Sequence, residues 1–210
     1  MSGADTRHPG LNLGQTDAGG HDAAEEVVFG FWVFLMSDMV LFAILFATYA
    51  TMSTHGQAGG PAPLDLVDLG SALAETLLLL GSSFTFGMAS LALKYREGRT
   101  RLVAWLALTF VLGAVFVGWE VHDVHVWITQ DDAPPQRSGF LSAHYLLTAT
   151  HGLHVAAGLL WMAVIAVQIG WFGLIREVKL RLMRLALFWH MLDIVWIGIF
   201  TFVFLYGAVR

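Results

Sequence analysis

Cysteine is absent from this chain of 210 residues. The sequence therefore offers no disulfide, no zinc–cysteine site and no cysteine-ligated iron–sulfur cluster. Charge is scarce as well, because Asp, Glu, Lys and Arg together make up 13% of the residues, about half the usual share in a soluble domain. The few basic residues form no patch suited to nucleic acid. These shortages exclude a disulfide scaffold and argue against a nucleic-acid partner.

Apolar residues are abundant instead, at 57% of the chain with a mean hydropathy of +0.67. A membrane helix needs about 20 mostly apolar residues. Five stretches qualify, at about 28–51, 66–93, 102–128, 139–170 and 184–207. No internal repeat and no second domain are visible, so the sequence predicts an all-α integral membrane bundle of five transmembrane helices. Residues 1–27 lack the apolar core of a secretory signal and are expected to form a flexible cytoplasmic tail.

The basic residues predict the orientation of the bundle. Eight of the eleven Lys and Arg residues lie in the loop 94–101 and the segment 171–184, and Arg7 in the tail is a ninth on the same side. Only Arg137 and Arg210 fall on the opposite side. Because Lys and Arg concentrate on the cytoplasmic side of membrane proteins, we expect a cytoplasmic N-terminus and a periplasmic C-terminus in a bacterial inner membrane.

Acidic residues interrupt the first two apolar stretches. Counting along ideal helices puts both Asp38 and Glu75 about 16 Å from the cytoplasmic edge, so their carboxyl groups are predicted to meet near mid-membrane. Two charges at that depth would repel, and at least one carboxyl is expected to be protonated. Two interpretations remain: a proton site, or a neutral acid that hydrogen-bonds two helices together.

Histidines mark the last two stretches. His151 and His154 share one face of the fourth helix, and His190 and Asp193 lie at matching depths on the fifth. Pairs of His151 with Asp193 and of His154 with His190 are therefore expected. Facing histidines suit a haem or a metal ion, but they suit interhelical hydrogen bonds equally well.

A third polar group is expected near the outer membrane surface, where solvation explains it. Its members are Glu120, His122, Asp123, His125 and His144.

Several motifs resemble subunit III of the haem-copper terminal oxidases, most closely the short five-helix form of bacterial cytochrome bo-type ubiquinol oxidases. They are FGFW at 29–32, LMSD at 35–38, ETLLL at 75–79, GWE at 118–120, THGLHV at 150–155 and FWHMLDIVW at 188–196. Together they extend over about residues 27–208. The last two motifs in this order are the most specific part of the resemblance.

The resemblance implies a role without a redox centre. In that family subunit I carries the haems and copper, reduces oxygen and pumps protons. Subunit III packs beside it, holds phospholipid in a cleft and supports assembly, stability and proton uptake. This chain is then expected to bind no haem, copper or other metal, to have no catalytic residue, and to act as an enzyme only within a ubiquinol oxidase complex. Its partners would be subunit I, other oxidase subunits and lipid.

On this interpretation the intramembrane polar residues are structural candidates. They are Asp38, Glu75, Glu120, His151, His154, His190 and Asp193. The alternatives are subunit III of a cytochrome c oxidase, a small proton-coupled transporter, and a haem-bearing membrane anchor. The transporter is disfavoured because the sequence shows neither an inverted repeat nor a broken helix.

Overall fold

The computed structural model describes residues 18–56, 69–95, 98–129 and 133–207, with side chains described from Glu25 onward. Within these ranges the regular structure is helical throughout. The helices are α1 (Ala18–His55), α3 (Leu69–Lys94), α4 (Arg99–Thr129), α5 (Gly139–Phe172), α6 (Arg176–Ile199) and the π-helical turn η1 (Phe200–Leu205), which continues α6. Five spans in the described residues are long and apolar enough to cross a membrane. The predicted all-α five-helix class is confirmed.

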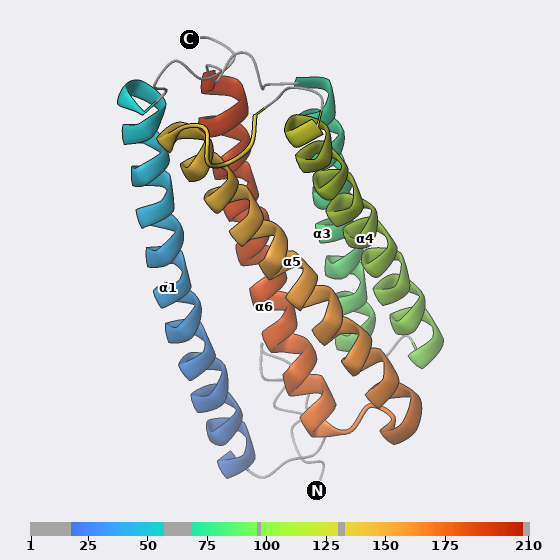
Figure 1. Ribbon diagram of the computed structural model, residues 1–210. Helices are drawn as coiled ribbons and strands as arrows, with labels where there is room; N and C mark the ends of the chain where they lie inside the picture. Colours follow the sequence, from blue (N-terminus) through green and yellow to red (C-terminus); the bar gives the residue numbers. More distant parts are fainter. Residues whose placement is uncertain (1–17, 57–68, 96–97, 130–132, 208–210) are drawn as a thin grey trace, which may run out of the picture.

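The five helices stand side by side with α5 and α6 in the middle (Figure 1). Helix α1 packs against α5 and α6 on one side, while α3 and α4 pack against each other and against α6 and α5 on the other. As a result α6 is the most buried span and α1 the least. Polar side chains from different helices can therefore meet at the faces of α5 and α6.

Two helices begin more than two turns earlier than the sequence predicted, and α4 begins slightly earlier, at Arg99 instead of about residue 102. Helix α1 starts at Ala18 instead of about residue 28, in a segment rich in the strong helix formers Ala and Glu. Helix α6 starts at Arg176 instead of about residue 184, because Val178 and Leu182 pack into the core from its first turns. Part of the expected tail is thus helical, and residues 1–17 lie outside the described residues.

Local signals fix the ends of α5. Its N-cap is Ser138, whose Oγ accepts a hydrogen bond of 3.1 Å from the backbone N–H of Leu141. Its C-cap is Gly173, with φ of 74°, a region that side chains with a Cβ avoid. The short link after Gly173 brings α6 back beside α5 and sets the register in which their polar residues face each other.

The indole of Trp189 occupies the centre of the bundle. A Cβ on Gly113 of α4 would lie 2.9 Å from Cη2 of this indole, and a Cβ on Gly158 of α5 would lie 3.1 Å from its Cζ3. Phe86 of α3 stacks on the same ring at a centroid distance of 6.4 Å. Glycine at the two contact positions thus lets α4 and α5 approach α6 closely.

Candidate functional site

Asp38 on α1 faces His154 on α5 near the middle of the bundle. Nε2 of His154 lies 3.3 Å from Oδ2 of Asp38, and both side chains are mostly buried. These two atoms are close enough for an ion pair, but Oδ2 of Asp38 forms no hydrogen bond that meets the geometric criteria. It links α1 to the rest of the bundle through a polar contact, and Phe42 of α1 packs on the same imidazole at 5.3 Å between ring centroids.

The other nitrogen of His154 constrains the protonation of this pair. Nδ1 of His154 lies 2.7 Å from the carbonyl oxygen of Thr150. A carbonyl only accepts, so Nδ1 carries the hydrogen, and in a neutral ring Nε2 would present a lone pair to Asp38. A lone pair facing a carboxylate is repulsive. The contact becomes attractive when the pair holds one further proton, on the imidazole or on the carboxyl group.

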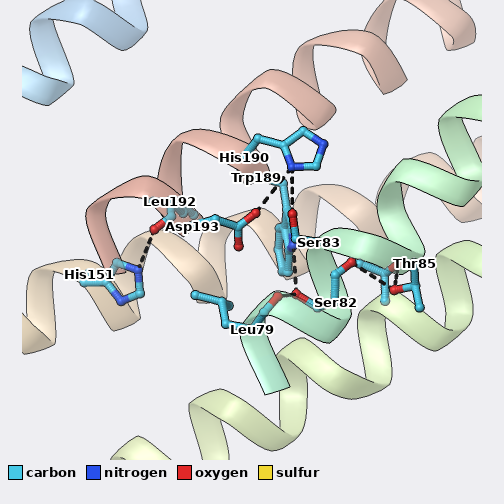
Figure 2. A network of polar contacts seen from close by, with 10 residues as sticks. Leu79, Ser82, Ser83, Thr85, His151, Trp189, His190, Leu192 and Asp193 are labelled. Atoms are coloured by element: carbon cyan, nitrogen blue, oxygen red, sulfur yellow. Dashed lines mark hydrogen bonds and ion pairs between the residues drawn. The ribbon is translucent and has the colours of Figure 1, made fainter. Parts of the chain in front are cut away.

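His190 of α6 contacts both Ser83 of α3 and Asp193 of its own helix (Figure 2). Nδ1 of His190 lies 2.9 Å from Oγ of Ser83 and 3.3 Å from Oδ2 of Asp193. The second carboxylate oxygen of Asp193 is buried and has no hydrogen-bond partner among the described residues. This group joins α6 to α3.

His151 points toward α6 and contacts its backbone. Nε2 of His151 donates to the carbonyl oxygen of Leu192 at 3.3 Å (Figure 2). The ring also packs against Trp196 at 5.2 Å and Phe116 at 5.8 Å between centroids. The expected pairs of His151 with Asp193 and of His154 with His190 are therefore wrong, although all four residues do lie between helices.

The expected contact between Asp38 and Glu75 is also wrong. Asp38 is on α1, which packs against α5 and α6, whereas Glu75 is on α3, which packs against α4 and α6. Glu75 is 3% exposed and lies within electrostatic reach of Glu120 and Asp123. Counting along the helices gave the two carboxyl groups a similar depth, but such a count leaves their lateral positions open, and the structure places them in different neighbourhoods.

Glu120 is inside the bundle and not in solvent as expected. It is 8% exposed, and a Cβ on Gly152 of α5 would lie 2.7 Å from its Oε2. Gly152 thus makes room for this carboxyl group. Both of its oxygens, like Oε1 of Glu75, are without a hydrogen-bond partner among the described residues.

His144 is the second residue of the outer polar group that was expected in solvent but is buried. It is 3% exposed and sits among aromatic rings, with Trp127 at 5.1 Å and Tyr145 at 5.9 Å between centroids. The expected exposure holds for His122 and His125. Asp123 is intermediate, because its Oδ2 accepts from Ser71 of α3 at 2.5 Å.

Hydroxyl groups of α3 form polar contacts that the sequence analysis missed. Oγ of Ser82 accepts from Nε1 of Trp189 at 3.1 Å, and Oγ1 of Thr76 accepts from Nε1 of Trp196 at 3.0 Å. Ser71 similarly accepts from Trp119 at 2.7 Å. The signal was present as an unusual density of Ser and Thr within one membrane span. These hydroxyl groups meet a chemical need, because a tryptophan N–H buried in a membrane requires an acceptor.

Comparison with known proteins identifies the family. The family model for cytochrome c oxidase subunit III matches residues 14–208. The chain belongs to this family. It is 49% identical over 188 residues to the cytochrome bo3 ubiquinol oxidase subunit 3 of Pseudomonas aeruginosa, covering 90% of this chain and 88% of that protein.

Two further relatives have similar names. The cytochrome bo3 ubiquinol oxidase subunit 3 of Pseudomonas putida is 47% identical, with 90% of this chain and 89% of that protein covered. A probable quinol oxidase subunit 3 of Staphylococcus epidermidis is 37% identical, with 86% and 89% covered. The resemblance drawn from the motifs is confirmed.

The THGLHV motif, one of the two that together carry the resemblance, can now be interpreted residue by residue. In THGLHV, Thr150 accepts from His154, His151 donates to α6, Gly152 accommodates Glu120 of α4, and His154 meets Asp38 of α1. One turn of α5 thus contacts three other helices.

Proposed function

We propose that this chain is the non-redox subunit III of a proton-pumping haem-copper oxidase of the bo type, which takes electrons from ubiquinol. Its role is to support the assembly, stability and proton uptake of subunit I. The match of nearly the whole chain to the subunit III family, together with relatives named ubiquinol oxidase subunit 3, carries this proposal.

The contacts of the histidines support a packing role. His151, His154 and His190 each have a polar partner on a neighbouring helix. In the described part of the chain no three His, Cys, Asp or Glu side chains are grouped so as to hold a metal ion. We infer that haem and copper belong to subunit I, which is the main partner, while the apolar outer faces of the helices contact lipid and the oxidase subunits.

An affinity tag on this chain tests the proposal. The purified complex should contain a haem-bearing partner and should oxidise ubiquinol but not reduced cytochrome c. The chain should show no Soret absorption once it is separated from that partner. Recovery of the chain without any haem-bearing partner would contradict the proposal. A Soret band that stays with the separated chain and is lost in His154→Ala would assign it a redox role, and oxidation of cytochrome c would favour the alternative oxidase.

We also propose that the N-terminus is cytoplasmic and the C-terminus periplasmic, in the bacterial inner membrane. Because the natural chain has no cysteine, single cysteines can be labelled without background. His55→Cys, at the end of α1, should react with an impermeant maleimide in intact spheroplasts. Tyr95→Cys and Trp171→Cys, which replace residues 66% and 82% exposed at the other end of the bundle, should react only after lysis. The opposite pattern would invert the proposed orientation.

A further inference from the structure

Helices α3 and α6 form a common outer face of the chain. Each helix contributes three residues at positions i, i+4 and i+7, which lie on one side of a helix. The contact of 2.9 Å between Ser83 and His190 joins the two stripes. Four of the six residues are exposed large apolar side chains. This surface is called the His190 face, and its residues are Leu80, Phe84, Gly87, His190, Ile194 and Ile197.

A polar atom without a partner lies on this apolar face. The side chain of His190 is 45% exposed. Its Nδ1 contacts Ser83 and Asp193, whereas Nε2 points away from both residues (Figure 2) and has no partner in the described part of the chain. His190 is the fifteenth residue of the 30 in the span Arg176–Leu205, so this nitrogen is presented near mid-membrane. Because hydrocarbon offers no hydrogen bond, Nε2 needs a partner from outside this chain.

Gly87 leaves room on the same face for a second helix to approach. A Cβ built on Gly87 would meet no atom within 4 Å, so packing within this chain does not explain the glycine. Gly113 and Gly158 differ, because a Cβ on either would press against Trp189. In membranes, small residues on an outer face allow close contact between helices, and polar side chains hydrogen-bond across that contact. The His190 face offers both features side by side.

We propose that the His190 face docks a membrane-spanning helix of subunit I, and that a polar side chain of this helix hydrogen-bonds Nε2 of His190. Acyl chains would leave Nε2 unpaired, and lipid headgroups lie far from mid-membrane. A helix can place one polar side chain at this depth and pack its apolar residues against Phe84 and Ile194. The inference rests on the proposed function, which makes subunit I the main partner.

Photocross-linking in the purified complex tests which molecule covers the face. Phe84 replaced by p-benzoylphenylalanine should cross-link this chain to subunit I, because the new side chain lies one turn from Gly87 on α3. The matched control replaces Leu153, which is exposed on α5. Helix α5 packs on the other side of α6 (Figure 1), so this position should not give that product. Equal yields from the two positions would overturn the inference, as would a product from Phe84 with lipid alone, with a second copy of this chain or with another subunit.

Two amide variants of His190 separate the outward nitrogen from the inward one. The amide of Asn reaches about as far as Nδ1 and can still bond Ser83, whereas the amide of Gln reaches about as far as Nε2. In an SDS titration of the complex that follows release of this chain, His190→Asn should weaken its retention about threefold, the usual effect of one polar contact between membrane helices. His190→Gln should be retained better than His190→Asn. The reverse order, or equal losses, would assign His190 to packing inside this chain and would overturn the inference.

A pair of glycine variants tests the close approach. Gly87→Leu adds bulk where nothing in this chain stands in the way, and it should weaken retention about tenfold by overpacking the contact with subunit I. Gly118→Leu on α4 also adds its Cβ where no atom lies within 4 Å, and it should leave retention unchanged. Equal retention of the two variants would overturn the inference. Failure of the chain to copurify with a haem-bearing partner would contradict the proposed function as well, whereas an intact complex without a cross-link from Phe84 would reject only the docking at the His190 face.

Discussion

Replacing Trp189 by alanine should lower the free energy of unfolding of this chain by about 3 kcal/mol, the lower end of the range for a fully buried aromatic residue. Trp189 is 1% exposed and contacts α4 and α5 where Gly113 and Gly158 leave room for its ring. The lower end applies because lipid is as apolar as the protein interior, so the loss comes mainly from van der Waals contacts. Titration of the purified complex with SDS in mixed micelles, following release of this subunit, measures the change.

Two control variants separate packing from other causes. Trp189→Phe keeps most of the ring and removes the N–H that donates to Ser82, so it should cost only about 1 kcal/mol. Trp171→Ala removes an indole that is 82% exposed and should change stability by less than about 0.5 kcal/mol. If Trp189→Ala were no more damaging than Trp171→Ala, the indole would not be the centre of the bundle.

The number and order of the spans followed from the sequence because membrane helices need long apolar stretches, and few other structures do. Helix ends were less predictable. Arg176 and the residues just after it are too polar to suggest a span, yet tertiary contacts of Val178 and Leu182 extend α6 across them. Hydropathy finds the part of a helix in hydrocarbon, and packing decides where the helix ends.

The polar contacts show a different limit. Depth counting placed Asp38 level with Glu75, but α1 and α3 lie on opposite sides of the central pair α5 and α6. Counting inward from about residue 139 places His154 about 8 Å from the cytoplasmic edge, against about 16 Å for Asp38, although the two residues are in contact. Helix tilt and extension beyond the bilayer shift such estimates by a turn or more. The sequence therefore identified residues that face other helices, but it did not identify the residue that each of them contacts.

The pair that the structure does form predicts an energetic coupling. Asp38→Ala should destabilise the bundle by about 1–3 kcal/mol, because it leaves His154 without its partner inside the membrane. In a double-mutant cycle with His154→Ala the coupling should be about 0.6 kcal/mol and at most about 1.7 kcal/mol, as for other polar contacts between membrane helices. Release of this subunit in the same SDS titration provides the four free energies.

A matched cycle tests whether this coupling is specific. Asp38→Ala combined with His190→Ala should be additive within about 0.5 kcal/mol, since His190 contacts Ser83 and Asp193 instead. Asp38→Asn should be milder than Asp38→Ala, because an amide can donate directly to Nε2 of His154 and needs no additional proton. Equal coupling in both cycles would show that the loss spreads through the whole bundle. An Asp38→Asn variant as unstable as Asp38→Ala would show that the charge of Asp38, and not its hydrogen-bonding shape, holds α1 to α5.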